Sequence, residues 1–141
     1  MALTASKSEL PSTVAKALSA CPPNAAHTLA QLRALIFDTA AARPEIGPLT
    51  ETLKWGEPAY LTDKTKSGTT IRLGWDDAGT CVSLFVHCQT TLVSEWRHLY
   101  EGELIFVGNR EVQIQTGNPF PHAPLQHCIA MALTYHSRKQ T

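Results

Sequence analysis

The feature that most constrains the fold is a change in the spacing of apolar residues near position 58. Before it, in residues 25–42, apolar side chains recur every three to four positions, as on one face of a helix. After it, in residues 69–75, apolar and polar side chains alternate, as in a strand with one buried face. Residues 51–60, rich in aromatic residues, Gly and Pro, separate the two regions. We interpret them as the hinge between a layer of helices and a sheet.

Helical spacing and helix boundary signals predict several helices. The pair Pro22 and Pro23 ends a first helix, Asn24 is a suitable N-cap for a second, and Pro44 ends that one. Pro is also favoured in the first turn of a helix, which places the start of a last helix at Pro124. The expected helices span residues 8–20, 25–42, 48–53 and 90–100, and the last begins at residue 124.

Period-2 alternation predicts a sheet. Residues 69–75 and 81–87 alternate in step and flank a turn with Asp–Gly chemistry at 76–79, which predicts an antiparallel hairpin. The other expected strands span residues 59–62, 104–107 and 111–116. This element order predicts an α+β fold. We expect a two-layer sandwich with a mostly antiparallel sheet of about five strands, its N- and C-terminal helices packed on one face.

Length and charge restrict the classes of function. A chain of 141 residues can build one core, so we expect a single domain over residues 1–141, with 1–7 as a loose tail. The 12 basic and 12 acidic residues cancel, which argues against nucleic acid and anionic membranes as partners. We expect no signal peptide. The four cysteines lack metal-ligand or disulfide spacing, which favours the cytoplasm and predicts no metal.

Two groups of residues are candidates for a binding site. Trp55 and Tyr60 could line a pocket or instead fasten the helices to the sheet; we expect the second role for Trp55. The second group shares the sheet face that points away from the helices: Arg72, Ser83, Phe85, His87, Gln113 and Gln115. Because an apolar ring gains from cover, we expect a second subunit, the loop of residues 117–124 or a small molecule to cover Phe85. Arg72 and His87 would then orient an anionic group.

The pattern of Glu51, Lys54, Trp55, Gly56, Glu57, Pro58 and Tyr60 resembles the YdhG-like family of bacterial domains of unknown function. The similarity extends over roughly residues 29–135. It implies an α+β domain reminiscent of frataxin, and some relatives are described as frataxin-like iron chaperones. It implies no catalytic residues. Frataxin-like iron binding uses a ridge of carboxylates on the first helix, whereas the helical first third here carries only Glu9 and Asp38.

These observations support three hypotheses. The first is a small cytoplasmic binding or interaction domain without enzymatic activity, whose partner is a small molecule, another protein or a second copy of the chain. The second, which follows from the resemblance alone, is a frataxin-like iron metallochaperone. The third is an enzyme of unknown chemistry, although the chain has no phosphate-binding loop, nucleophile elbow or zinc-protease motif. No motif identifies a cofactor.

Overall fold

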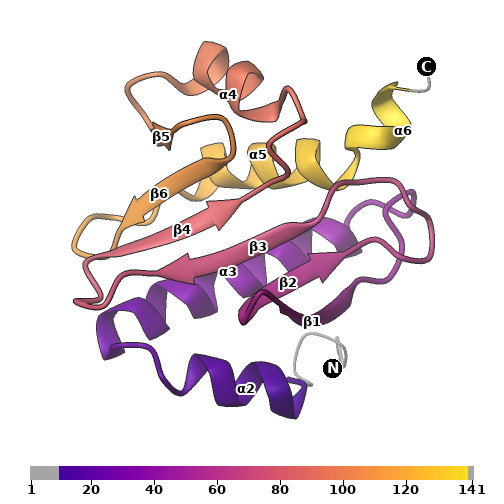
Figure 1. The fold of residues 1–141 in the computed structure, drawn as a ribbon. Coiled ribbons are helices and arrows are strands. Elements are labelled where there is room, and N and C mark those ends of the chain that lie inside the picture. The colour runs from indigo at the N-terminus through magenta and orange to yellow at the C-terminus, as the bar shows by residue number, and fades with distance from the viewer. Residues whose placement is uncertain (1–9, 140–141) are drawn as a thin grey trace.

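The computed structural model describes residues 10–139, which form a six-stranded sheet with helices packed against it (Figure 1). The tail expected for residues 1–7 lies outside this range. The helices are α2 (Ser12–Leu18), α3 (Pro23–Ala41), α4 (Leu92–Tyr100), α5 (His122–Leu133) and α6 (Tyr135–Lys139). The strands are β1 (Thr50–Lys54), β2 (Glu57–Leu61), β3 (Ile71–Trp75), β4 (Cys81–Phe85), β5 (Ile105–Val107) and β6 (Glu111–Gln115). The α+β class is therefore confirmed.

The sheet has the strand order β1-β2-β3-β4-β6-β5, and every neighbouring pair is antiparallel. The predicted hairpin is formed by β3 and β4, in which Arg72 lies opposite Phe85 and Gly74 lies opposite Ser83. This register places the alternating polar side chains of neighbouring strands on the same face. The sequence prediction of one polar face and one apolar face is therefore confirmed for this hairpin.

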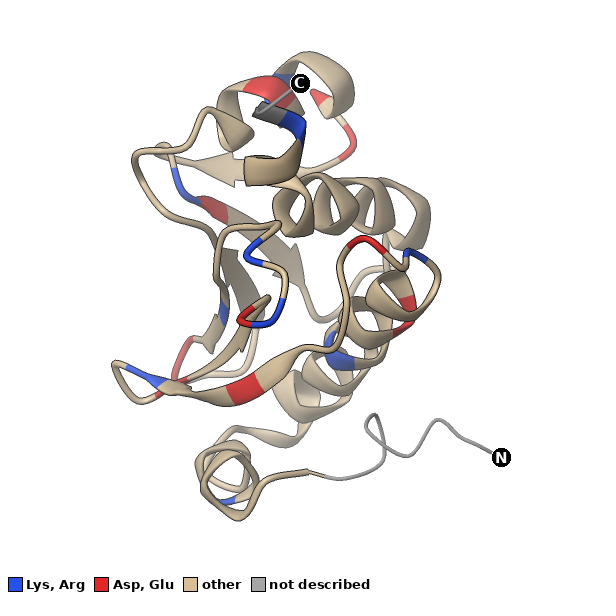
Figure 2. Ribbon diagram, turned by 90° about the vertical axis from the view of Figure 1, so that its right-hand side faces the viewer, with Lys and Arg blue, Asp and Glu red and all other residues tan. Residues whose placement is uncertain are grey.

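The long helices α3 and α5 lie together on the apolar face of the sheet, as Figure 2 shows from the side. The apolar stripe of α3, which includes Leu29, Leu32 and Ile36, is buried in the core. Leu125 and Ile129 of α5 belong to the same core. None of the helices within residues 10–139 has the length and apolar character needed to cross a bilayer. The opposite face of the sheet, which we call the open face, carries no helix layer (Figure 1).

The structure corrects the expected hinge. Residues 48–53 were expected to form a turn of helix, but Thr50–Lys54 is strand β1, so the sheet has six strands instead of about five. Residues 51–60 thus form one hairpin, with Trp55 and Gly56 as its two-residue turn. Glu51 and Leu53 alternate with Thr50 and Thr52, which is a strand pattern. The sequence does not indicate this hairpin, because Trp is not a residue that usually marks a two-residue turn.

Some expected boundaries are also wrong. Helix α3 begins at Pro23, in the first helical position, and Asn24 does not cap it. Proline suits this position because its missing N–H would have no partner inside the helix anyway. Strand β4 ends at Phe85, two residues earlier than expected, so His87 is not in the sheet.

Candidate functional site

Trp55 is the most exposed large apolar side chain of the described residues, at 90%. It occupies the first position of the β1–β2 turn with a φ of 57°, and Gly56 follows with a φ of 75°. Two successive positive φ values are the pattern of a type I′ turn, which prefers Asn followed by Gly. A bulky residue in this conformation is unusual. The Trp55 indole is exposed and is not buried between the helices and the sheet. The prediction that Trp55 fastens the helices to the sheet is therefore wrong.

The centre of the open face holds an ion pair stacked on an aromatic ring. The Arg72 Nη1 donates to Glu57 Oε1 at 2.7 Å, and the Arg72 guanidinium carbon lies 5.4 Å from the centre of the Phe85 ring. Gly74 leaves room for this arrangement, since a Cβ there would approach Glu57 Oε2 to 3.0 Å and Phe85 Cε2 to 3.1 Å. Arg72 thus covers one side of Phe85. Because Glu57 already neutralises Arg72, the attraction that we predicted for an anionic group is reduced.

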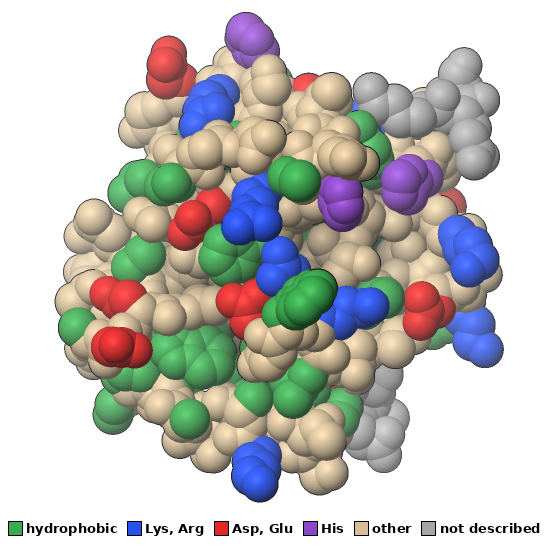
Figure 3. Space-filling model, viewed as in Figure 1, with side chains coloured by type: hydrophobic (Ala, Val, Ile, Leu, Met, Phe, Trp, Pro, Cys, Tyr) green, Lys and Arg blue, Asp and Glu red, His purple; other side chains and the backbone are tan. Residues whose placement is uncertain are grey.

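A second polar cluster lies beside the first. The Ser83 hydroxyl donates to Glu111 Oε2 at 2.6 Å, and the Gln113 amide donates to the same oxygen at 3.1 Å. Ser83 is buried, at 7% exposure, so its hydroxyl needs a partner within the protein, and Glu111 provides it. Figure 3 shows charged side chains of both signs interleaved with apolar ones over the open face. The open face is therefore a paired polar network, with hydrophobic side chains among its groups.

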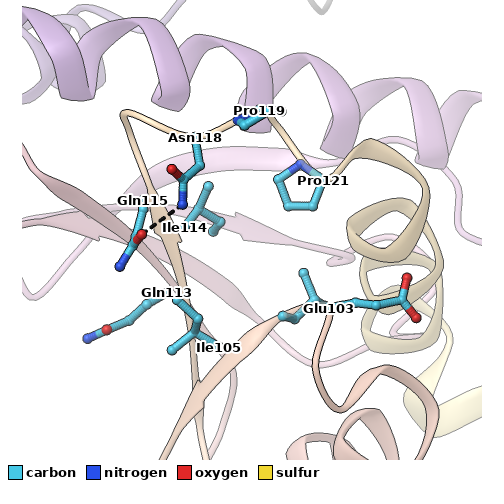
Figure 4. A pocket seen from close by; sticks show the side chains of 9 residues that line it. Glu103, Ile105, Gln113, Ile114, Gln115, Asn118, Pro119 and Pro121 are labelled. Carbon is cyan, nitrogen blue, oxygen red and sulfur yellow. Dashed lines mark hydrogen bonds between the residues drawn. The ribbon is translucent and has the colours of Figure 1, made fainter.

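Gln113 also lines a small pocket at the β5–β6 edge, together with Ile105 and Pro121 (Figure 4). The pocket has a volume of about 100 Å³, and the Asn118 amide donates to Gln115 Oε1 at 2.8 Å on its wall. The loop of residues 117–124 follows the end of β6 that pairs with Cys81, whereas Phe85 pairs with the other end. Residues of this loop therefore line the pocket. The loop starts from the end of β6 away from Phe85, so the expectation that it covers the Phe85 ring is not met.

His87 is exposed and lies beyond the end of β4, where its Nδ1 accepts a hydrogen bond from the Gln89 N–H at 3.1 Å. It therefore does not join the Arg72 and Phe85 group as a sheet residue. The neighbouring Cys88 is also exposed, while Cys81 is half-buried. Residues 10–139 contain no group of three or more His, Cys, Asp or Glu side chains that could hold a metal ion.

Tyr60 lies on the opposite face of the sheet from Arg72 and is completely buried. Its ring packs edge-on against Phe37 at a centroid distance of 5.8 Å. Glu51 is its cross-strand partner, and the Glu51 carboxylate is held by two hydrogen bonds from Arg33. Within the described part of the chain, the Tyr60 hydroxyl has no hydrogen-bond partner. Burial, and then the nearby Glu51 charge, raise the pKa of the Tyr60 hydroxyl well above its usual value.

Tyr60 lines a cavity of about 210 Å³ between α2, α3 and the sheet. The rest of the lining is almost entirely apolar, apart from Arg33 and the Cys21 thiol. It comprises Leu10, Leu18, Ala26, Leu29, Ala30, Ala34 and Leu73. Of the two residues expected to form a pocket, Tyr60 therefore lines a cavity and Trp55 does not.

Sequence reasoning also missed a polar pair between α4 and α5. The Tyr100 hydroxyl lies 2.5 Å from His127 Nδ1, and the two rings meet edge-on. Burial is the main cause that raises the pKa of the Tyr100 hydroxyl. His127 also lines a groove of about 540 Å³ between the C-terminal end of α3 and α5. Tyr100 lies 27 positions before His127 and no motif links the two, so the sequence gives no signal for this pair.

The chain was compared with models of known protein families, with curated proteins and with solved structures, and none of them matches. The functional interpretation therefore depends on the geometry described above.

Proposed function

We propose that this chain is a small, non-enzymatic interaction domain that binds a partner protein, with Trp55 as the anchor of the contact. We also propose that it belongs to the YdhG-like family, on the pattern of residues 51–60. The observation that supports the first proposal is the combination of 90% exposure and positive φ at Trp55. Exposed tryptophans are rare in a surface chosen only for solubility, and they are enriched among the residues that contribute most to binding.

The conformation of Trp55 strengthens this argument. A non-glycine residue in the left-handed region costs about 1–2 kcal/mol, and Asn would fit the turn better. An indole that is 90% exposed also gains almost nothing from burial within the fold. The residue therefore stabilises neither the turn nor the core, and such strained, exposed residues concentrate at functional sites.

The surroundings of Trp55 favour a protein over other partners. With 12 basic and 12 acidic residues, the chain has no net charge to attract an anionic membrane or a phosphate backbone. One indole buries less apolar surface than an acyl chain, which by itself gives only marginal membrane binding. On the open face next to the Trp55 hairpin, the Phe85 ring lies beside the paired Arg72 and Glu57 side chains, and Glu57 belongs to the hairpin itself. Apolar groups among paired polar side chains are typical of a protein interface.

The test compares the parent chain with Trp55→Asn and with Leu99→Asn, a control that removes another apolar residue with 50% exposure. Partners captured by the parent are purified and their dissociation constants are measured. We expect one partner to lose about 30-fold in affinity with Trp55→Asn, which corresponds to a hot spot of about 2 kcal/mol, and to bind Leu99→Asn like the parent. The Trp emission should shift to the blue when that partner binds.

Three outcomes would contradict the proposal. In the first, no purified partner depends on Trp55. In the second, both variants lose affinity equally. In the third, Trp55 mediates association only with a second copy of this chain or with lipid vesicles. The frataxin-like iron role stays a prediction, which the lack of a metal-ligand group within residues 10–139 does not support.

A further inference from the structure

The β1–β2 hairpin, which carries Trp55 at its tip, is joined to the rest of the sheet by a short ladder. Strands β1 and β2 pair with each other over five residues, whereas within residues 10–139 β2 pairs with β3 only at Ala59 and Tyr60. Pro58 has no N–H group, so it donates no hydrogen bond to a neighbouring strand. A two-stranded hairpin is at best marginally stable without further packing. Contacts other than the ladder therefore help to set the direction in which this hairpin leaves the sheet.

Two ion pairs provide such contacts, and they lie on opposite faces of the sheet. On the helix side, Arg33 of α3 donates to Glu51 of β1 through Nε and Nη2, at 2.6 and 2.8 Å. On the open face, Arg72 of β3 donates to Glu57 of β2 at 2.7 Å. Glu51 lies opposite the buried Tyr60 and shares its face, whereas Glu57 and Tyr60 point to opposite faces of β2. Each strand of the hairpin is therefore held by an arginine from another element.

Both arginines are themselves held in place by an aromatic ring. The Arg33 guanidinium carbon lies 4.9 Å from the centre of the Phe37 ring, and that of Arg72 lies 5.4 Å from the centre of the Phe85 ring. The face of an aromatic ring attracts a guanidinium group, so these contacts restrict the rotamers of the two arginines. An arginine fixed in this way also fixes the glutamate to which it donates. The two pairs therefore restrain the hairpin more than two freely moving surface ion pairs would.

We propose that Arg33 and Arg72 are positioning residues for the Trp55 contact: by holding the β1–β2 hairpin from its two faces, they fix the direction in which it presents the indole. This inference rests on the proposed interaction function of Trp55. A fixed hairpin favours binding, because affinity falls when only a fraction of the molecules has the conformation that binds. The Glu51 side chain is almost completely buried, whereas Glu57 is partly exposed. The Arg72–Glu57 pair is therefore the one to remove with little effect on overall stability.

The experiment measures the motion of the hairpin in the full chain by NMR relaxation of the backbone amides, and it needs no partner. In the parent, the amides of Trp55 and Gly56 should have order parameters of about 0.85, as in rigid backbone. In Glu57→Ala these order parameters should fall toward about 0.6, the upper limit of flexible backbone. The matched control is Glu95→Ala, which removes the partly exposed Arg138–Glu95 pair at 3.7 Å and should leave the hairpin amides unchanged. Both variants should melt within a few degrees of the parent.

A charge exchange separates positioning from a general loss of packing. Glu57→Arg combined with Arg72→Glu restores an ion pair between the same two positions, so the double variant should regain the order parameters that each single variant loses. Glu51→Gln, measured under conditions in which it stays folded, should loosen the same amides from the helix side. Against a purified partner whose binding requires Trp55, Glu57→Ala should weaken the affinity by about 3–10-fold, because the hairpin then points in the binding direction for only part of the time.

Two results would overturn the inference. One is an unchanged order parameter at Trp55 and Gly56 in Glu57→Ala, which would mean that the ladder alone fixes the hairpin. The other is an equal loss of order in Glu95→Ala, which would mean that the effect is not specific to the pair on the hairpin. Failure of the interaction function appears separately, as partner binding that does not change in Trp55→Asn, and it leaves the order parameters unaffected.

Discussion

Arg33 and Glu51 form a two-point ion pair that joins helix α3 to the edge strand β1. The Arg33 Nε lies 2.6 Å from Glu51 Oε2, and Nη2 lies 2.8 Å from Oε1. The side chains are only 15% and 5% exposed, so water screens the pair poorly. The hydrogen bond to Glu51 is the main cause that raises the pKa of Arg33 above its usual value. Parallel donation from a guanidinium to a carboxylate is the strongest common form of such a pair.

We therefore predict that Glu51→Gln lowers the free energy of unfolding by roughly 3 kcal/mol. Breaking a buried pair from one side costs about 3–5 kcal/mol, because the remaining charge stays in a poorly hydrated place. Denaturant titration measures this loss. The control is Glu45→Gln, which breaks the exposed Arg43–Glu45 pair at 3.6 Å and should cost less than about 1 kcal/mol. Equal losses in the two variants would show that the buried pair is not structurally important.

We predict that replacing Trp55 does not lower the free energy of unfolding, whereas replacing a core tryptophan does. Trp55→Asn should leave the free energy of unfolding unchanged or raise it by up to about 1 kcal/mol, because Asn suits the positive φ of this turn. A buried tryptophan would instead lose about 3–5 kcal/mol on truncation. The matched control is Trp96→Asn, since Trp96 is fully buried in the core and should be strongly destabilised. A large loss of stability in Trp55→Asn would contradict the exposed turn.

The fold was predictable from the sequence wherever apolar periodicity and turn residues agreed. The hairpin of β3 and β4 has both signals, namely alternation in step and an Asp–Gly turn, and the structure confirms it. Strand β1 has only weak alternation, and its turn contains Trp55 where Asn would be typical. The sequence signal there was ambiguous, so the strand was missed and the sheet was predicted with too few strands.

The candidate site was less predictable, because it depends on pairs of residues distant in the sequence. Alternation placed Arg72 and Phe85 on one face, but it could not show that Glu57 pairs with Arg72. Glu57 reaches Arg72 because β2 pairs with β3 and begins at Glu57, two residues before the strand expected over residues 59–62. The cavity beside Tyr60 depends on how α2 packs near the sheet, which a periodic pattern does not specify.

The loop between β2 and β3 gives a prediction about packing. Ser67 donates from its hydroxyl to the Leu133 carbonyl at 2.8 Å, and a Cβ added at Gly68 would lie 2.4 Å from the Leu133 backbone. Backbone atoms cannot rotate away as a side chain can. Gly68→Ala should therefore lower the free energy of unfolding by about 1–3 kcal/mol, as overpacked sites do.

The control for Gly68 is Gly117→Ala, since a Cβ at Gly117 meets nothing within 4 Å. It should change the free energy of unfolding by less than about 0.5 kcal/mol. Thermal and denaturant unfolding of the two variants measure the difference. If Gly68→Ala is as stable as Gly117→Ala, the loop does not pack closely on the end of α5.

The cysteines give a prediction about reactivity and pH. Cys88 is exposed, whereas Cys128 is buried in α5, and burial raises the pKa of the Cys128 thiol to about 12. Because the thiolate is the reactive form, Cys128 would be ionised only to the order of 10⁻⁴ at pH 8. We expect a thiol reagent to label Cys88 first at pH 8 and Cys128 only when the fold opens. Cys88→Ser should remove the fastest phase, and denaturant should make all four thiols react. Labelling of Cys128 at the rate of Cys88 in the folded chain would contradict its place in the core.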